Sequence, residues 1–223
     1  MIAEALELVR QRIRRAALAA NRDPGAVRLI AVSKTKPASC IREAYAAGQR
    51  DFGENYAQEL HEKARELSDL PDLRWHFIGH LQSNKAKMVA PIAHVIHSVD
   101  SASLVRELER RLASGGRSPM EVLVEVNVGG EAQKHGVSPE SLATLLDLVH
   151  EAPHLRLKGL MTIPPNDPER ARRAFADLAA LREKHGGAAR LPELSMGMSQ
   201  DLDDAIAGGA TMVRVGTAIF GER

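Results

Sequence analysis

Lys34 is the residue of this chain best placed to do chemistry. It follows an almost continuous apolar run that begins at Val27, and such a run is typical of a strand buried on both faces. Side chains alternate along a strand, so Ile30 and Val32 point the same way as Lys34 and form an apolar floor beneath it. A free lysine titrates near about 10.4 and is a poor nucleophile at neutral pH. Loss of water, or a cation such as Lys36, would make it a reactive amine; the alternative is a strand-end lysine that only extends into water.

Two glycine turns late in the chain are candidates for an anion site. Gly197-Met198-Ser199 is expected to open a helix, and Gly216-Thr217 follows the last expected strand. Glycine lets the backbone approach a ligand, free N–H groups at a helix start bind phosphate, and the Ser199 and Thr217 hydroxyls add donors. The alternative is that these residues form ordinary turns and helix caps.

The elements that must position these residues alternate regularly. Strand-like apolar runs are followed by helical patterns, after an amphipathic helix at 2–20. Eight such units closing on themselves give a parallel (β/α)8 TIM barrel, typically of about 250 residues. We expect strands at 27–33, 50–53, 74–79, 94–98, 121–128, 155–161, 193–197 and 211–215, and helices at 38–48, 55–67, 82–89, 101–114, 138–150, 168–186 and 199–207.

The barrel is expected to be a single domain over residues 1–223. Only Thr217–Arg223 follows the last strand, which is too short for a full eighth outer helix, so the helix at 2–20 is expected to cover that gap. In this fold the chemistry lies where strands end and loops begin. Lys34 and the anion site would then share one mouth. That combination suits a phosphorylated aldehyde held as an imine, for which pyridoxal phosphate is the obvious cofactor.

Composition excludes several other classes of function. The chain has 30 basic and 29 acidic residues, a net charge of +1, so no global charge favours nucleic acid or acidic membranes. No apolar run approaches the roughly 20 residues that span a bilayer. Cys40 is the only cysteine, which excludes an internal disulfide and favours a reducing compartment, so we expect a cytoplasmic protein. The histidine pairs have no cysteine or glutamate to complete a metal set, so we expect no metal.

Six segments of the chain resemble the pyridoxal phosphate homeostasis protein family, and the resemblance covers the whole length. It implies a barrel of the alanine racemase N-terminal type and an imine between Lys34 and the cofactor aldehyde. The segments are Ala31–Pro37, Phe52–Tyr56, Trp75–Lys85, Gly159–Met161, Ser195–Ser199 and Val213–Gly221.

The resemblance also assigns the other cofactor contacts. It implies that Ser199, Gly216 and Thr217 surround the phosphate, and we expect Gly197 of the same turn to belong to the cofactor site as well. It implies further that Arg214 lies near the pyridine nitrogen and that Asn55 and Met161 line the pocket.

Arg214 bears on what the bound cofactor does. A guanidinium does not give up its proton in a protein, so it would donate a hydrogen bond to the pyridine nitrogen and leave the ring unprotonated. An unprotonated ring is a weaker electron sink, which disfavours reactions that need a stabilised carbanion. The alternative for Arg214 is a structural ion pair with a loop carboxylate.

Two classes of function follow from the resemblance. The first is a protein that binds pyridoxal phosphate and hands it to dependent apoenzymes, without robust catalysis. The second is an enzyme, either an amino-acid racemase or another lysine-imine enzyme. Related racemases add a C-terminal β-domain with a catalytic tyrosine, whereas this chain ends at the barrel and its tyrosines, Tyr45 and Tyr56, fall outside the expected mouth or at its rim. We therefore expect the first class, acting as a monomer.

Overall fold

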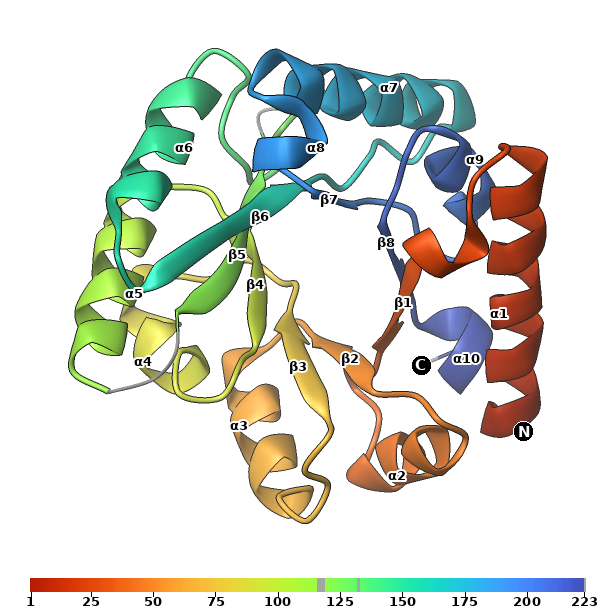
Figure 1. Cartoon of the computed structure of the whole chain (residues 1–223). Helices are drawn as coiled ribbons and strands as arrows, with labels where there is room; N and C mark the ends of the chain where they lie inside the picture. The colour runs from red at the N-terminus through yellow and green to blue at the C-terminus, as the bar shows by residue number, and fades with distance from the viewer. Residues whose placement is uncertain (116–118, 132, 223) are drawn as a thin grey trace.

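The chain folds into a closed barrel of parallel strands that follow one another in sequence order, β1 to β8. The computed structural model describes residues 1–115, 119–131 and 133–222. Helices surround the barrel (Figure 1), which confirms the predicted (β/α)8 TIM barrel with an extra N-terminal helix. The strands are β1 (Arg28–Val32), β2 (Asp51–Glu54), β3 (Arg74–Phe77), β4 (Val95–Val99), β5 (Met120–Glu125), β6 (Leu155–Met161), β7 (Glu193–Ser195) and β8 (Met212–Val215).

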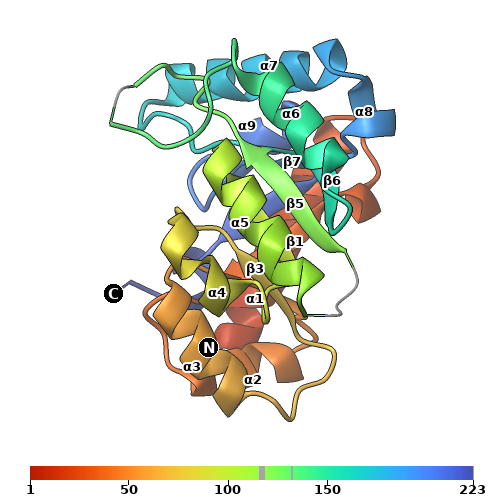
Figure 2. The same ribbon diagram turned by 90° about the vertical axis from the view of Figure 1, so that its left-hand side faces the viewer.

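The outer ring is built from helices of very different lengths. Figure 2 shows α5 and α6 on the outside of the barrel, over β5 and β6. The α-helices are α1 (Ile2–Ala19), α2 (Ala38–Ala46), α3 (Ala57–Glu66), α4 (Ala86–Val89), α5 (Ala102–Ala113), α6 (Leu142–Glu151), α7 (Pro168–Lys184), α8 (Gly187–Arg190), α9 (Leu202–Ala207) and α10 (Thr217–Phe220); the short 3₁₀ helices are η1 (Pro24–Ala26) and η2 (Ser83–Lys85).

Several helices begin later than the sequence predicts, and hydrogen bonds account for the delay in two of them. Helix α6 begins at Leu142 instead of 138, because Val137 is held beside the end of β5: its N–H donates to the Glu125 carbonyl at 2.8 Å. Helix α9 begins at Leu202 instead of 199, because the Met198 N–H donates to the Asp201 carboxylate at 2.6 Å and closes a turn first. Strands β3, β5 and β7 likewise end earlier than predicted, and the short helices η1, α8 and α10 were not predicted.

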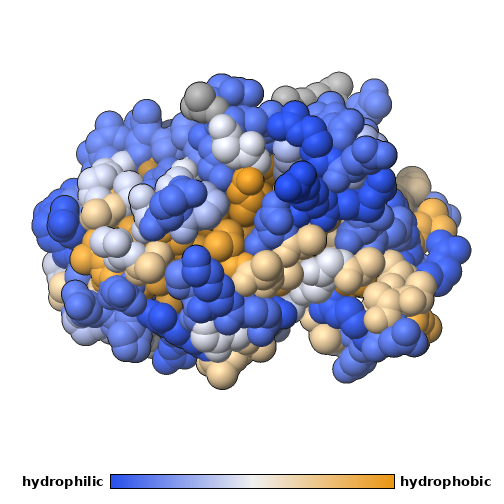
Figure 3. All heavy atoms as spheres, turned by 90° about the horizontal axis from the view of Figure 1, so that it is seen from above, coloured by the Kyte–Doolittle hydropathy of each residue, from blue (hydrophilic) through white to orange (hydrophobic). Residues whose placement is uncertain are grey.

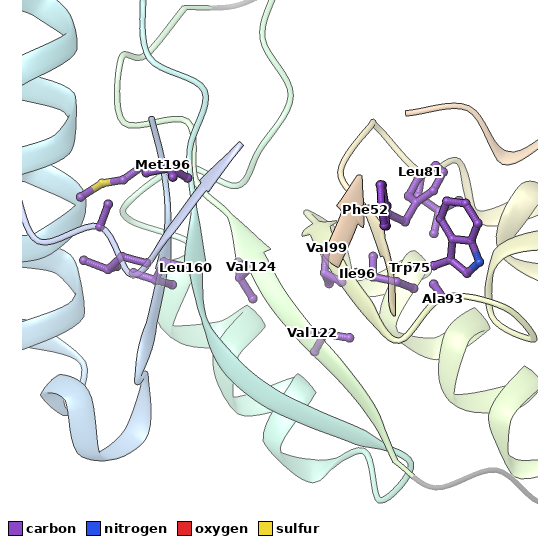
Figure 4. Packing of buried hydrophobic residues seen from close by; sticks show 14 of the residues in the cluster. Phe52, Trp75, Leu81, Ala93, Ile96, Val99, Val122, Val124, Leu160 and Met196 are labelled. Carbon is purple, nitrogen blue, oxygen red and sulfur yellow. The ribbon is translucent and has the colours of Figure 1, made fainter. Parts of the chain in front are cut away.

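The main hydrophobic core lies between the strands and the helices. Figure 4 shows its side chains, with Phe52, Trp75 and Ile96 projecting from the outer faces of β2, β3 and β4. Because side chains alternate along a strand, their neighbours point into the barrel. On β4, Ile96 joins this outer core, whereas Val95 packs inside the barrel. Burial on both faces explains the continuous apolar runs seen in the sequence.

Helix α1 covers the gap left by the short last helix, as predicted. It packs against α9, α10 and α2, and Figure 1 shows it beside α10 at the edge of the barrel. Its inward stripe is buried, with Leu6, Val9, Ile13 and Ala17 spaced three or four residues apart. The segments at the two ends of the chain are therefore packed together beside β1 and β8.

Figure 3 shows one face, on which hydrophilic residues predominate and apolar residues appear in a band between them. Within the described ranges, no helix combines the length and the apolar character that crossing a membrane requires.

Candidate functional site

A cavity of about 870 Å³ opens at the carboxyl ends of the strands. Its walls come from the segments that follow β1, β2, β3, β5, β6, β7 and β8. This is the end of the barrel at which TIM-barrel sites occur. Six of the eight predicted site residues line it, namely Lys34, Asn55, Ser199, Arg214, Gly216 and Thr217.

Two predicted site residues, Met161 and Gly197, do not line this cavity. Met161 is fully buried and packs with Val95 and Leu123 inside the barrel, deeper than the loops. Gly197 has a φ of +92°, and a Cβ placed there would lie 2.5 Å from the Cβ of Ala205. The packing of α9 against the end of β7 therefore requires glycine at this position, and contact of Gly197 with a ligand stays a prediction.

The turn that carries Lys34 is held by a buried lysine of α3. Lys34 lies in a turn two residues beyond the end of β1, and it lines the cavity together with Val32. The Lys63 ammonium donates to the Ser33 carbonyl at 2.6 Å. On the other side of Lys34, the Thr35 N–H donates to the Glu59 carboxylate at 2.6 Å. The residues on each side of Lys34 are therefore both fixed by α3.

Lys63 also forms a buried ion pair with Glu54 at the end of β2. Their charged atoms lie 2.7 Å apart, and the side chains are 7% and 0% exposed. The Ser33 hydroxyl donates to the same Glu54 oxygen at 2.6 Å. Burial raises the pKa of Glu54, although the Lys63 charge acts in the opposite direction. An ion pair buried in this way does little for net stability, but losing one partner leaves an uncompensated charge.

The opposite wall of the cavity is formed by the loops after β7 and β8. Helix α1 holds the first of them, because the Arg12 guanidinium donates to the Ser199 carbonyl at 2.6 Å and pairs with Asp203 at 2.6 Å. At the second, a Cβ on Gly216 would lie 3.0 Å from the Val32 carbonyl oxygen, so only glycine fits without a shift.

Helices α9 and α10 are too short to supply a strong dipole at this wall. They contain six and four residues, and Ser199 lies in a turn before α9. The predicted attraction of an anion to a helix start is therefore weak here. Binding of an anion would depend on the two hydroxyl groups and on N–H groups of the loops, such as those of the first turn of α10, which have no partner within that helix.

Arg214 is buried on the floor of the cavity. It pairs in register with Ile30 of β1, because closure of the barrel places β8 beside β1. Its guanidinium donates to the Ser195 hydroxyl at 2.7 Å and to the Thr162 carbonyl at 2.9 Å. Burial lowers the pKa of Arg214 to about 10, so it remains charged at neutral pH. Among the described residues no carboxylate forms an ion pair with it, which argues against the alternative of a loop ion pair.

Glu125 at the end of β5 is a second buried ionisable group near Arg214. Its side chain is 4% exposed. Burial and then the nearby Asp100 charge raise the pKa of Glu125 to about 7, while the Arg214 charge opposes them. Glu125 therefore changes charge in the physiological range.

Two clusters at the mouth were not predicted from the sequence. Glu131 and Lys134, paired at 2.6 Å, line the cavity from the loop after β5. His80, Asp100 and His135 also come together, with their possible ligand atoms within 4.8 Å of one another. The two imidazole rings stack with their centroids 3.7 Å apart and their planes 8° from parallel. The spacing of these residues in the sequence carries no signal for either cluster.

Comparison with known proteins gives a consistent result over the whole chain. The family described as the alanine racemase N-terminal domain matches residues 5–223. The pyridoxal phosphate homeostasis protein of Pseudomonas aeruginosa is 52% identical over 225 residues, covering 100% of this chain and 96% of its relative. The protein of the same name from Escherichia coli K12 is 44% identical, covering 100% of this chain and 97% of that one.

Solved structures agree with these relatives. The structure of PipY of Synechococcus elongatus PCC7942, with PLP bound, has a TM-score of 0.84 at 42% identity, covering 99% of this chain and 100% of that one. Alanine racemase from Streptomyces coelicolor A3(2) has a TM-score of 0.75 at 22% identity, covering 99% of this chain and 59% of that one, which shows a shared fold.

The Lys63–Glu54 ion pair generates a first prediction. Replacing Lys63 by Met leaves Glu54 buried without its partner, so the free energy of unfolding should fall by about 3–5 kcal/mol. Urea denaturation measures this. The double variant Glu54→Gln/Lys63→Met should recover much of the loss, because no buried charge remains. Arg42→Met breaks the exposed pair with Asp69 and should change stability only slightly; an equally small effect of Lys63→Met would contradict the buried-pair analysis.

A second prediction concerns the pH dependence of stability. A carboxyl whose pKa rises on folding from its ordinary 4.5 to about 7 stabilises the fold below 4.5, and that contribution is lost as the pH rises through 7. Between pH 5 and pH 8 the wild type should therefore lose about 2.5 kcal/mol relative to Glu125→Gln, which has no charge to bury. Denaturation curves of both proteins at several pH values test this; parallel pH profiles would show that Glu125 titrates normally.

Proposed function

The chain belongs to the pyridoxal phosphate homeostasis protein family, and we propose that it binds pyridoxal 5'-phosphate in the cavity at the mouth of the barrel. In this proposal Lys34 holds the cofactor as an imine. The protein takes part in vitamin B6 homeostasis and catalyses no robust reaction of its own. The observation that carries the proposal is the meeting of Lys34, Arg214 and the Ser199 and Gly216–Thr217 loops in one cavity.

The residues of the cavity fit this cofactor. The loops of Ser199 and Thr217 offer hydroxyl and N–H donors for a phosphate, and Gly216 keeps the backbone close to β1. Asn55 lines the cavity, and its side-chain oxygen is buried with no hydrogen-bond partner among the described residues. Buried polar atoms are normally satisfied, so an orphaned one in a cavity wall is consistent with a ligand that satisfies it.

The residues of the cavity have three roles in this proposal: attachment of the cofactor, binding of its phosphate and contact with its ring nitrogen. The bound cofactor supplies an aldehyde that condenses with an amine, and Lys34 supplies that amine from a turn fixed by Lys63 and Glu59. Ser199 and Thr217 bind the phosphate and set the position of the ring. Arg214, which stays protonated, donates a hydrogen bond to the ring nitrogen.

Two features support binding without robust catalysis. A ring nitrogen that accepts a hydrogen bond from Arg214 is unprotonated, which weakens the ring as an electron sink. Neither tyrosine lines the cavity: Tyr45 packs 3.8 Å from the Arg50 guanidinium, and Tyr56 lies at the start of α3. The names of the relatives agree with a role in homeostasis. We propose further that the protein acts as a monomer in the cytoplasm and passes the cofactor to dependent apoenzymes.

The first test of this function is the site of attachment. Lys34, Lys36 and Lys134 all line the cavity. Borohydride reduction followed by peptide mass mapping should place the pyridoxyl group on Lys34, and Lys36→Ala should leave that label in place. The assignment would be rejected by a label on Lys36 or Lys134 together with a Lys34→Ala variant that keeps the yellow colour of the bound cofactor.

The second test concerns the phosphate. A hydrogen bond to a charged group contributes about 1.5–3 kcal/mol, so Ser199→Ala/Thr217→Ala should weaken binding of pyridoxal phosphate by about a hundredfold or more. Affinity for unphosphorylated pyridoxal should change little. Ser83→Ala/Ser103→Ala, which removes an exposed hydroxyl pair elsewhere, is the matched control. Equal losses for both ligands would mean that the phosphate binds elsewhere.

The third test separates a cofactor-binding protein from an enzyme. A missing general acid or base typically lowers a rate by about 10²–10⁴-fold, so any turnover of amino acids should be slow. A chiral assay with alanine and other amino acids measures this beside transfer of the cofactor to an apoenzyme. Racemisation at ordinary enzyme rates, abolished by Lys34→Ala, would make the protein an amino-acid racemase instead.

A further inference from the structure

A row of polar side chains crosses the interior of the barrel below the cavity. TIM-barrel interiors are normally filled by branched apolar side chains. In this barrel His76 of β3, His97 of β4 and Ser195 of β7 are all fully buried there. Figure 1 shows β3 and β4 across the barrel from β7 and β8, so this row spans the interior.

Each member of the row lies within hydrogen-bond distance of the next. The Arg214 guanidinium contacts the Ser195 hydroxyl at 2.7 Å, and that hydroxyl lies 2.8 Å from Nδ1 of His97. Nε2 of His97 lies 2.9 Å from Nδ1 of His76. Nε2 of His76 lies 2.9 Å from the Asp51 carboxylate at the start of β2. The row therefore connects the floor of the cavity to the opposite end of the barrel.

The charge states of the row fix the direction of every hydrogen bond. Burial lowers the pKa of both His76 and His97, so each ring is neutral at pH 7 and carries one N–H. Burial is the largest single effect on Asp51 and opposes its ionisation. The hydrogen bond from His76 and the neighbouring positive charges together outweigh burial, so the pKa of Asp51 falls. A carboxylate can only accept, so His76 donates from Nε2 and must accept at Nδ1.

The same reasoning continues to the other end of the row. His97 donates from Nε2 to His76 and accepts at Nδ1 from the Ser195 hydroxyl. The Ser195 oxygen is then left to accept from Arg214, which is always a donor. All four bonds run from Arg214 toward Asp51, and each has one donor and one acceptor.

We propose that Asp51, His76, His97 and Ser195 form a hydrogen-bond relay that positions Arg214 for the ring nitrogen of the bound cofactor. This inference rests on the proposed function. The relay fixes one guanidinium nitrogen, the Thr162 carbonyl fixes the other at 2.9 Å, and the remaining N–H groups are left for a ligand. Aligned bonds ending in a carboxylate also stabilise the buried Arg214 charge.

The relay makes a prediction that needs no cofactor. In protein labelled with ¹⁵N-histidine, NMR should show His76 and His97 as neutral rings protonated at Nε2, with N–H signals slow to exchange with water. Asp51→Asn removes the charge at the end of the relay and keeps an acceptor, so both rings should remain in the Nε2–H form. A ring protonated at Nδ1, or charged at pH 7, would overturn the relay.

The second experiment tests what the relay positions. Binding is measured with pyridoxal phosphate and with an analogue in which a C–H group replaces the ring nitrogen. His97→Phe breaks the relay, so it should weaken pyridoxal phosphate binding by about tenfold or more and leave binding of the analogue unchanged. His97→Gln keeps one donor and one acceptor, so it should retain most of the affinity. Val95→Ala is the control, because it removes interior packing without touching the relay.

The outcomes separate this inference from the proposed function. If the wild type binds neither compound, the proposed function is wrong. If it binds pyridoxal phosphate and His97→Phe lowers the affinity for both compounds equally, or for neither, the relay does not position Arg214. If His97→Phe does not fold, the comparison is made with Ser195→Ala, which removes the relay's contact with Arg214 and should weaken pyridoxal phosphate binding while sparing the analogue. Equal effects on both compounds would contradict the proposal.

Discussion

The buried ammonium group of Lys63 is the interaction on which the site most depends. It is satisfied by the Ser33 carbonyl, by Glu54 of β2 and by Glu59 of its own helix. A buried charge cannot lose its partners without a large cost in free energy, so the turn between β1 and α2 has little freedom to move. The reactive lysine therefore projects from a turn whose flanking residues are both tied to α3.

Closure of the barrel supplies the rest of the site. Strand β8 pairs with β1, so Arg214 lies beside Ile30 although the two are far apart in sequence. The loop of Ser199 is held from outside by Arg12 of α1, and Arg214 is held from inside by Ser195. Helix α1 thus does more than cover a gap in the outer ring. The positions of Lys34, Ser199 and Arg214 are set by three separate networks, each satisfied largely by buried or half-buried groups.

The sequence predicted what depends on local pattern. The alternation of strands and helices predicted the barrel, and residues at strand ends such as Lys34 and Asn55 do line the cavity. Contacts between residues that lie far apart in the sequence were not predicted. His135 and Lys134 reach the mouth only through the path of a long loop. Met161 and Gly197 fell inside recognisable segments, but packing within the barrel and against α9 turned them away from the cavity.

The relay is a second example of contacts that sequence patterns do not predict. His76, His97 and Ser195 were visible as polar residues within predicted strands, yet nothing in their spacing joined them. Their contacts require strands on opposite sides of a closed barrel, and Asp51 joins only through the register of β2 with β3. Sequence patterns indicate which residues point inward, whereas pairing across an interior follows from the closed three-dimensional arrangement.

A crystal structure of the protein with pyridoxal phosphate tests the central claim most directly. The account predicts continuous density from the Lys34 amine into the ligand. It predicts the phosphate between the Ser199 and Thr217 loops, and Arg214 within hydrogen-bond distance of the ring nitrogen. Ligand density elsewhere, or a ligand in the cavity with its phosphate away from both loops and no bond to Lys34, would contradict it.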